Sequence, residues 1–448
     1  MRILKRTAVA VVIVLAVAGV ASAWSLSHIA SGPALPASPA SASNLLTTAV
    51  LDGSDAAKIR RGQYLARAGD CLSCHITPGG EPFAGGRPLN TPFGTIYSSN
   101  ITSDPDHGIG RWTPDEFYAA MHDGIGIGNR HLYPAFPYPW FRRLSRDDDD
   151  ALLSFLKTLP PSSATPPGNS LAFPMNLRFG VALWNTLYLH DNDGRARPRN
   201  ASEALRRGEE LVRGAGHCSA CHSPKNRLGA DQVAHDLQGG LVDDFLAPDL
   251  SGNKRTGLGI WSAEDIAEYL KTGRNSSGAA GGPMADVITY STSLLTDNDR
   301  HAIAIYLKSL PASPDAPVVA ADDRSLKRGG AVFSDVCTAC HLENGTAQPT
   351  LFPPLPGNAV VQQNDPTGVL HIILAGSRVG PSPTRSTPAT MPSFAWKLTD
   401  QEVADVSTYI RNSWGNQARP VTAGEVAILR KQLGLTHLRL TDNSGDRQ

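Results

Sequence analysis

The chain reads Cys71-Leu-Ser-Cys74-His75, Cys218-Ser-Ala-Cys221-His222 and Cys337-Thr-Ala-Cys340-His341 at three places, and these stretches contain all six of its cysteines. Each has the form Cys-x-x-Cys-His, the attachment pattern of c-type haem. The two thiols add across the vinyl groups of the porphyrin, and the adjacent histidine faces the iron as its proximal ligand. The repetition predicts three covalently bound haem c groups, with attachment points Cys71, Cys74, Cys218, Cys221, Cys337 and Cys340 and proximal iron ligands His75, His222 and His341.

Cys-x-x-Cys pairs also occur in zinc sites, thioredoxin-type sites and disulfides. Structural zinc needs two pairs close together to supply four ligands, and these pairs lie far apart in the sequence. A thioredoxin-type site needs only one pair. A disulfide across two residues would not select a following histidine three times. The haem interpretation is therefore favoured.

Length and composition agree with this interpretation. The 448 residues suffice for about three domains of ordinary size. Lys plus Arg number 41 and Asp plus Glu also number 41, so the charge balance gives no indication of nucleic-acid binding. Frequent Gly and Pro with few aromatic residues suit loops that wrap round a large apolar cofactor.

The N-terminus has the outline of a secretion signal. Arg2, Lys5 and Arg6 form a basic start, residues 7–20 are uncharged and mostly apolar, and small residues precede Trp24, before which cleavage is expected. The alternative is an uncleaved anchor, for which the run is slightly short. Residues 24–54, rich in Ala, Ser and Pro, are expected to form a flexible tether. The chain is therefore expected to be exported, with 1–23 as its signal peptide.

The same order of features recurs three times, which is typical of tandem domains. Each unit opens with a helix that carries an Arg-Gly pair and runs into the haem motif. A Gly- and Pro-rich loop, a short helix, another loop and a last helix with a Ser or Thr cap follow. No strand is indicated. The order predicts an all-α fold of three tandem class I cytochrome c domains.

The boundaries follow from the composition. The three domains, called below the first, second and third units, are expected at 55–160, 201–311 and 324–415. Two linkers are expected, at 161–200, with a helical segment, and at 312–323. The tail at 416–448 contains an apolar pattern that suits either a packing helix or an interfacial membrane helix.

Two methionines are candidates for distal iron ligands. Met284 and Met391 each lie in a Gly- or Pro-rich loop shortly before the last helix of their unit. A proline-flanked Met in such a loop suits an axial ligand, which raises the haem potential. The alternative is a Met that fills a gap in the core.

The first unit departs from this pattern. Phe136 stands close to the position that Met391 has in the third unit, and phenylalanine cannot bind iron. His131 and Met175 are the candidates for the distal ligand there, and five-coordinate iron also remains open. Met121 is expected to pack in the core. The proximal histidines also need an acceptor for their second ring nitrogen, and the carbonyls of Pro78 and Pro224 are proposed for that role.

Further strings carry a family resemblance. They are Gly85-Gly86-Arg87, Thr91-Pro92-Phe93-Gly94-Thr95-Ile96-Tyr97, Asn100-Ile101-Thr102, Gly108-Ile109-Gly110 and Arg130-His131-Leu132-Tyr133-Pro134-Ala135. With them the chain resembles, over residues 55–415, the triheme cytochrome c subunits of bacterial periplasmic membrane-associated dehydrogenases. Its stretch Tyr133-Pro-Ala-Phe136-Pro-Tyr138 is more similar to cytochromes that accompany molybdenum hydroxylases. Relatives with flavin or quinoprotein partners typically carry Met at the position of Phe136.

The resemblance implies an electron relay without catalytic residues of its own. A catalytic dehydrogenase subunit, which would be a molybdenum hydroxylase, a flavoprotein or a quinoprotein, would supply electrons. Three haems would pass them to ubiquinone, another cytochrome or a terminal oxidase. The expected place is the periplasm, at the outer face of the inner membrane. The alternative is a multihaem peroxidase or reductase that uses an open haem in the first unit, where His122 and His131 would be the acid–base residues.

Overall fold

The computed structural model describes residues 44–47, 53–190, 201–242, 244–347, 351–378 and 390–435. The predicted signal peptide and most of the predicted tether lie outside these residues. Within the tether segment, residues 44–47 form a helical turn, and Leu46 is fully buried in the core of the first unit. Nε of Arg67 donates to the Leu46 carbonyl at 2.7 Å. This part of the tether segment is therefore attached to the first unit.

The helices follow the order expected from the sequence. The first unit contains α3 (Ala56–Ala68), α4 (Cys71–Cys74), α5 (Pro114–Asp123), α6 (Tyr138–Phe141) and α7 (Arg146–Leu156), and α8 (Phe179–Tyr188) lies in the linker segment. The second contains α9 (Glu203–Glu210), a π-helical stretch (Leu211–Ala215), α10 (Ser219–His222), α11 (Ala263–Thr272), α12 (Pro283–Tyr290) and α13 (Asp297–Lys308). The third contains α14 (Asp323–Val336), α15 (Thr338–His341), α16 (Ala359–Gln362), α17 (Thr367–Ala375) and α18 (Asp400–Asn412), followed by α19 (Ala423–Gln432). Single 3₁₀ turns occur at Ile127–Asn129, Val233–His235 and Thr292–Leu294.

Polar side chains and glycines close to the helix ends cap several helices. Thr113, Ser262 and Thr399 each accept a hydrogen bond from a backbone N–H three residues later and complete a capping box with an acid there. Gly124 and Gly273 end α5 and α11 in the left-handed conformation, with φ of 64° and 77°. Local sequence therefore sets these boundaries.

In each unit the opening helix crosses the last helix at a glycine. A Cβ on this glycine would overlap a backbone carbonyl of the last helix, so only glycine permits the contact. The three pairs are Gly62 with Ala151, Gly208 with Ala302, and Gly329 with Asp405. The arginine before each glycine binds an aspartate of the same last helix. These ion pairs are Arg61–Asp148 at 2.8 Å, Arg207–Asp299 at 2.8 Å and Arg328–Asp405 at 2.6 Å. The repeated Arg-Gly pair thus fixes the helix crossing.

Short antiparallel strands accompany the helices. They are β1 (Pro88–Thr91), β2 (Gly94–Tyr97) and β5 (Ser170–Leu171) in one sheet, and the pairs β3 (Ile125–Gly126) with β4 (Arg130–His131), β6 (Gln238–Val242) with β7 (Phe245–Asp249), and β8 (Ser377–Arg378) with β9 (Thr390–Met391). The helical scaffold is as predicted, but the expectation of a strand-free, all-α fold is wrong. The strands have two to five residues, which is too short for a period-two pattern to stand out.

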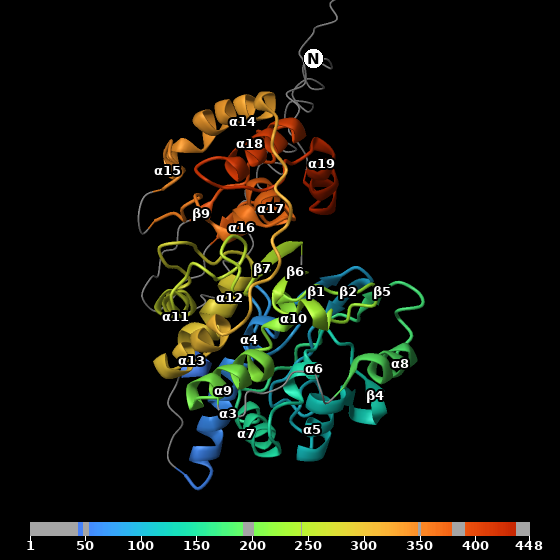
Figure 1. Cartoon of the computed structure of the whole chain (residues 1–448). Helices are drawn as coiled ribbons and strands as arrows, with labels where there is room; N and C mark the ends of the chain where they lie inside the picture. Colours follow the sequence, from blue (N-terminus) through green and yellow to red (C-terminus); the bar gives the residue numbers. More distant parts are fainter. Residues whose placement is uncertain are drawn as a thin grey trace, which may run out of the picture.

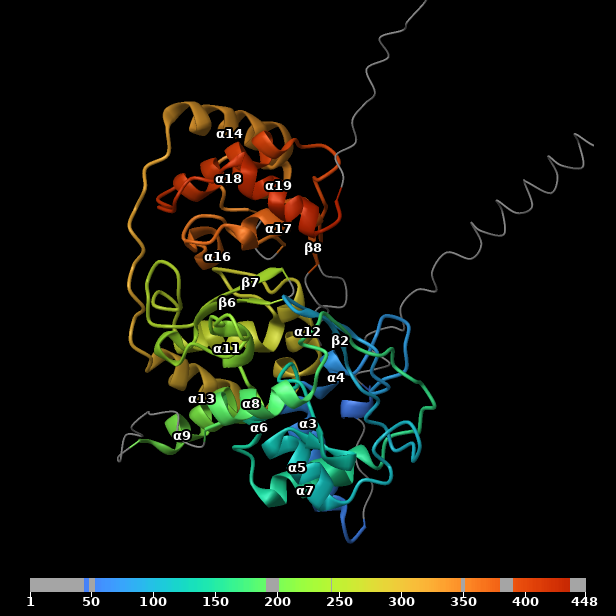
Figure 2. The same cartoon turned by 90° about the vertical axis from the view of Figure 1, so that its right-hand side faces the viewer.

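The three units follow one another along the molecule. In Figure 1 the third unit lies at one end, the second in the middle and the first at the other end. In Figure 2 the stretch from Ser309 to Asp322 runs along the outside of the second unit to reach α14. Each unit has its own cluster of buried hydrophobic residues.

The end of the described chain also packs against the third unit. Val426 and Leu429 of α19 are buried in the third core, and Arg430 donates to the carbonyls of Ala395 and Leu398. The apolar pattern in the tail therefore belongs, as far as Leu435, to a packing helix. Among the residues described, no helix combines the length and apolar character that crossing a bilayer requires.

Candidate haem sites

Each Cys-x-x-Cys-His motif forms one helical turn after the opening helix of its unit. The backbone N–H of each histidine donates to the carbonyl of the first cysteine, at 3.0 Å in the first unit and 2.9 Å in the other two. Residues three apart lie on the same face of such a turn, so both thiols of a motif point the same way. None of the six cysteines, all of which are described, is in a disulfide.

Burial shifts the pKa of several groups in the three motifs. Burial raises the pKa of Cys71, Cys218 and Cys337 to about 12, with smaller contributions from nearby acids and thiols. Burial also lowers the pKa of the three motif histidines. A neutral imidazole offers a nitrogen lone pair, which is what an iron ligand needs.

The second ring nitrogen of the motif histidines faces a distant carbonyl. Nδ1 of His75 lies 2.6 Å from the Ser99 carbonyl, and Nδ1 of His222 lies 2.7 Å from the Pro248 carbonyl. The proposal of Pro78 and Pro224 for this role is therefore wrong. The reason is that the chain returns past each histidine only at the far end of its following hairpin, just after β2 in the first unit and within β7 in the second.

The third unit follows the same plan with a looser contact. The Pro353 carbonyl lies near the His341 ring and partly opposes the lowering of its pKa by burial. Within the described residues, however, Nδ1 of His341 has no well-formed hydrogen bond. Each of the three carbonyls belongs to the residue just before a similar loop stretch, which reads Asn100-Ile-Thr, Asp249-Leu-Ser-Gly-Asn and Pro354-Leu-Pro-Gly-Asn in the three units. The backbone carbonyl beside the motif histidine therefore recurs in all three units. A carbonyl that accepts from the second ring nitrogen fixes the orientation of the imidazole.

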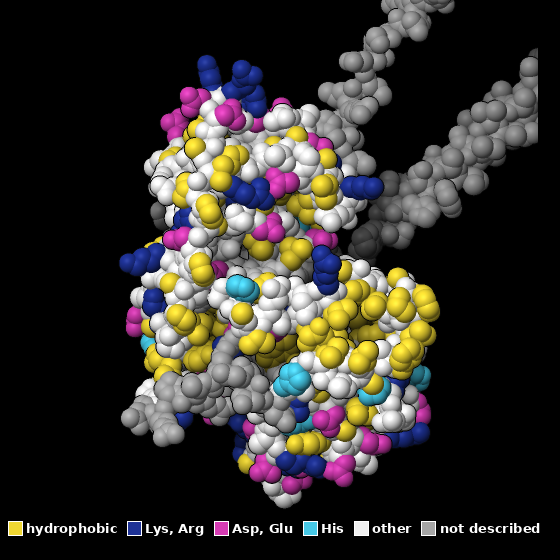
Figure 3. All heavy atoms as spheres, turned by 45° about the vertical axis from the view of Figure 1, so that its right-hand side comes forward, with side chains coloured by type: hydrophobic (Ala, Val, Ile, Leu, Met, Phe, Trp, Pro, Cys, Tyr) yellow, Lys and Arg dark blue, Asp and Glu magenta, His cyan; other side chains and the backbone are white. Residues whose placement is uncertain are grey.

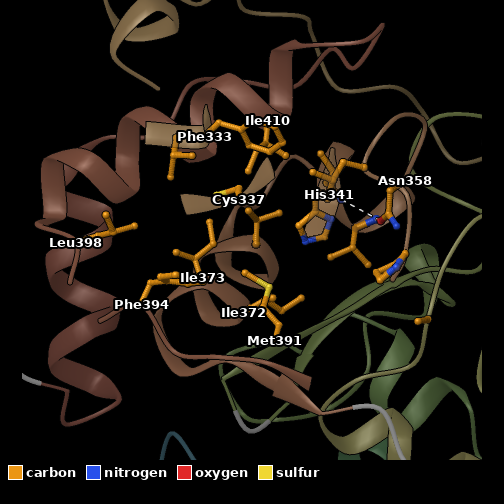
Figure 4. A pocket seen from close by; sticks show the side chains of 17 residues that line it. Phe333, Cys337, His341, Asn358, Ile372, Ile373, Met391, Phe394, Leu398 and Ile410 are labelled. Atoms are coloured by element: carbon orange, nitrogen blue, oxygen red, sulfur yellow. Dashed lines mark hydrogen bonds between the residues drawn. The ribbon is translucent and has the colours of Figure 1, made fainter. Parts of the chain in front are cut away.

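A cavity that is open in part to solvent lies beside the third motif. Cys337, His341 and Met391 all line it, and the remaining walls are almost entirely apolar. Figure 4 shows the His341 imidazole and the Met391 thioether both directed into the cavity, with Phe394 and Ile373 beside them. An apolar space with a histidine nitrogen and a thioether sulfur suits a haem with two axial ligands.

Two short strands place Met391 in this wall. Met391 pairs with Ser377 in the β8–β9 ladder. Gly376 ends α17 with a φ of 82°. A Cβ on Gly376 would lie only 2.6 Å from the carbonyl oxygen of Met391. A side chain at Gly376 would displace the loop that carries the thioether. The predicted position of Met391 before the last helix thus has a structural cause.

Met284 was expected in a loop of the second unit, but the structure places it at the start of a helix. It lies in the first turn of α12 and packs with Cys218 against the second hydrophobic core. Gly282, at φ of 56°, precedes it, and a Cβ there would overlap the ring of Phe245. The close approach of Phe245 therefore requires glycine at the entry to this turn.

The first unit brings no methionine to the corresponding place. Phe136 packs against the first core, with its ring centroid 5.7 Å from that of Phe141. Met121 is buried in that core, as predicted. Met175 lies on an exposed loop, where its carbonyl accepts from the Tyr133 hydroxyl at 3.0 Å.

His131 differs from Met175 because part of its ring is enclosed. Its Nδ1 is buried without a hydrogen-bond partner in the part of the chain that the structure describes. Its carbonyl accepts from Arg178 at 2.6 Å. His122, by contrast, is buried with Nε2 at 2.7 Å from Asp149, and its ring stacks on Tyr118 at 3.9 Å. His122 is thus engaged inside the helical scaffold.

The first and second motifs lie against each other. Arg87 donates to the Ser73 carbonyl at 2.6 Å, inside the first motif, and to Asp286 of the second unit at 2.8 Å. Burial raises the pKa of Cys74 to about 12, and Asp70 and Cys221 are close enough to add to this increase. Arg87 belongs to one of the family strings in the sequence, but no local signal pointed to Asp286.

The second and third units also meet beside a haem motif. Ala279 of the second unit lines the cavity that holds His341. Gln363 donates to the Thr256 carbonyl at 2.6 Å, and Nδ1 of His371 lies 2.8 Å from the Asp244 carbonyl. The three motifs therefore lie in a continuous series that polar contacts between the units hold together.

Comparison with known proteins gives the same assignment. A family model for cytochrome c matches residues 205–311 and 326–414. The gluconate 2-dehydrogenase cytochrome c subunit of Pantoea cypripedii is 40% identical over 403 residues, which cover 85% of this chain and 91% of that protein. The chain belongs to the family of dehydrogenase cytochrome c subunits. As a member of the cytochrome c family it carries covalently bound haem c.

Other relatives of this cytochrome serve different dehydrogenases. The cytochrome c subunit of the quinone alcohol dehydrogenase of Gluconobacter oxydans is 38% identical over 396 residues, covering 84% of this chain and 83% of that protein. One subunit of the nicotinate dehydrogenase of Pseudomonas putida is 39% identical over 367 residues, which are 80% of this chain and 30% of that larger protein. The cytochrome unit is thus shared among complexes named for different substrates.

Proposed function

We propose that this cytochrome is a triheme electron-transfer subunit made of three tandem class I cytochrome c domains. It would take electrons from a catalytic dehydrogenase subunit in the periplasm and deliver them to ubiquinone or another respiratory acceptor at the outer face of the inner membrane. The observation that carries the proposal is the third cavity, where His341 and Met391 face an apolar space beside the Cys337 thiol.

The residues fit the group in each unit. His75, His222 and His341 would be proximal ligands, and Met284 and Met391 distal ones. Haem c supplies reversible one-electron transfer, whose potential the axial ligands set. The chain would contribute covalent attachment, imidazoles that backbone carbonyls orient in the first two units, and largely apolar walls in the third. In the first unit no methionine stands at the corresponding place, and His131 is the candidate whose unpartnered ring nitrogen is enclosed.

The contacts between units support a relay. The ion pair between Arg87 and Asp286 holds the first motif against the second unit, and Ala279 brings the second unit to the third cavity. Electron transfer between cofactors needs such close, fixed positions. The named relatives are all parts of dehydrogenases, so the partner would be a molybdenum hydroxylase, a flavoprotein or a quinoprotein. None of them supports a peroxidase.

Counting covalent haems tests the proposal. The haem-loaded chain should carry three haems by mass and by absorbance of the reduced α-band. Cys337→Ser with Cys340→Ser should carry two, whereas Thr338→Ala, which changes the same turn but keeps both thiols, should carry three. After reduction with dithionite, the haems should be reoxidised by a short-chain ubiquinone or an oxidised cytochrome c. A chain without covalent haem, or one that reduces neither acceptor, would contradict the proposal.

A further inference from the structure

The helix α8 turns Val181 and the polar Asn185 toward the protein and exposes large apolar side chains on its outer side, unlike an ordinary surface helix. Asn185 points inward, where it accepts from the Tyr138 hydroxyl at 2.6 Å and donates to the Asp123 carbonyl at 3.0 Å. The opposite stripe consists of Phe179, Leu183 and Leu187, which are 74%, 62% and 49% exposed. Polar side chains thus hold the helix in place while large apolar side chains face outward.

The surface continues beyond the helix. Phe173 is 79% exposed in the loop before α8, and Leu228 of the second unit lies beside Trp184, whose indole N–H donates to the Leu228 carbonyl at 3.0 Å. Figure 3 shows hydrophobic side chains gathered over this side of the molecule. A continuous apolar surface of this kind marks an interaction site on a soluble domain.

Basic residues outnumber acidic ones around this surface, although the exposed Asp123, whose carbonyl accepts from Asn185, also lies beside α8. No Asp or Glu occurs from residue 151 to residue 190, and the charged side chains of that stretch are Lys157 and Arg178. Arg130 lies close enough to Arg178 to lower its pKa, after the larger effect of burial, and Arg130 and Arg227 are both exposed. The charge pattern is therefore complementary to an anionic surface.

We infer that α8 and the loop before it form a monotopic contact with an anionic lipid bilayer. The side chains protrude from the surface, and a bilayer accepts protruding phenylalanine and leucine without a matching pocket. Aromatic residues such as Trp184 and Tyr188 suit the headgroup region, and basic residues at the rim attract anionic lipids. This inference rests on the proposed function only in placing the chain beside the inner membrane.

Vesicle binding of the haem-loaded chain tests this surface. Wild type should co-sediment with vesicles of phosphatidylcholine and phosphatidylglycerol, and less with phosphatidylcholine alone. Phe179→Ser with Leu183→Ser should weaken the partition about a hundredfold, because two buried apolar side chains are lost. The matched control is Ile428→Ser, which changes a 63% exposed residue on α19 and should bind as wild type does. Haem spectra and thermal unfolding should be the same in all three.

Hydrogen exchange locates the contact independently of any other membrane attachment. Exchange in peptides covering residues 173–188 should slow when anionic vesicles are added, and peptides of α19 should not change. Unchanged exchange at 173–188, or a double variant that binds like wild type, would overturn the inference while leaving the haem count intact. A double variant that still binds vesicles but loses its catalytic subunit or a second copy would also overturn it, because the surface would then be a protein interface.

Discussion

The first and third units share a scaffold but differ at the place that faces the proximal histidine. Both cross their opening and last helices at a glycine, Gly62 and Gly329, and both hold the histidine in one turn after the opening helix. In the third unit Met391 faces the cavity of His341. In the first unit Phe136 stands near the equivalent place and packs with Phe141.

This difference separates two tasks of the sequence. The attachment motif and the helix crossing build a haem-binding scaffold, and both units keep them. Under the proposed ligation, the distal residue would tune the iron, and it differs between these two units while the scaffold is the same. The family model for cytochrome c matches residues 205–311 and 326–414, which are the second and third units.

The largest expected effect comes from exchanging the distal residues. Met391→Ala should lower the potential of one haem by on the order of 0.1 V, because a thioether ligand stabilises ferrous iron. Phe136→Met should shift one potential upward. A spectroelectrochemical titration of the three haems measures both changes.

A buried methionine elsewhere provides the control. Met121→Leu keeps the volume of a residue in the first core and should leave all potentials unchanged. If Met391→Ala titrates as wild type does, the third unit has no thioether ligand, and its difference from the first unit disappears.

Local signals in the sequence were enough for the scaffold. Thr113, Ser262 and Thr399 cap helices through contacts within one turn, and such contacts can be recognised from neighbouring residues. Met391 could be predicted because it occupies the same place relative to the last helix as Met284. Repetition thus replaced the missing long-range information.

A second effect is expected at the helix crossings that the units share. Gly62→Ala and Gly329→Ala should each destabilise the protein by about 1–3 kcal/mol, because the new methyl group would overlap a carbonyl of the last helix. Thermal unfolding followed by circular dichroism measures the loss. Gly180→Ala is the matched control, since no atom lies within 4 Å of its Cβ position in α8, and it should stabilise by about 0.5–1 kcal/mol. Equal stability of Gly329→Ala and wild type would show that the crossing can relax.

Long-range features could not be predicted from neighbouring residues. The carbonyls of Ser99 and Pro248 reach the motif histidines only because a hairpin returns the chain 24 or 26 residues later. Prolines next to the motif were plausible only from proximity in sequence. The outward face of α8 was also hidden, because periodicity shows that a helix has an apolar stripe but not which way the stripe points.

The smallest expected effect compares the Arg–Asp pairs. Arg207 binds both oxygens of Asp299, at 2.8 and 2.9 Å, and the Tyr64 hydroxyl of the first unit donates to the same carboxylate. Burial pushes the pKa of Asp299 up, but the bonds from Arg207 and Tyr64 outweigh it and lower the pKa. Arg61 makes one bond to Asp148, and its side chain is 42% exposed.

Arg207→Gln should therefore cost about 1 kcal/mol at pH 7, and Arg61→Gln less than about 0.5 kcal/mol. A carboxylate with a lowered pKa stabilises the fold above its unfolded value of about 3.9 and loses that contribution as the pH falls through the folded value. The stability of wild type should thus fall more steeply below about pH 5 than that of Arg207→Gln. Urea unfolding at several pH values measures both slopes. Equal slopes of stability against pH would show that the Arg207–Asp299 pair, which Tyr64 of the first unit also contacts, contributes no more to stability than the exposed Arg61–Asp148 pair.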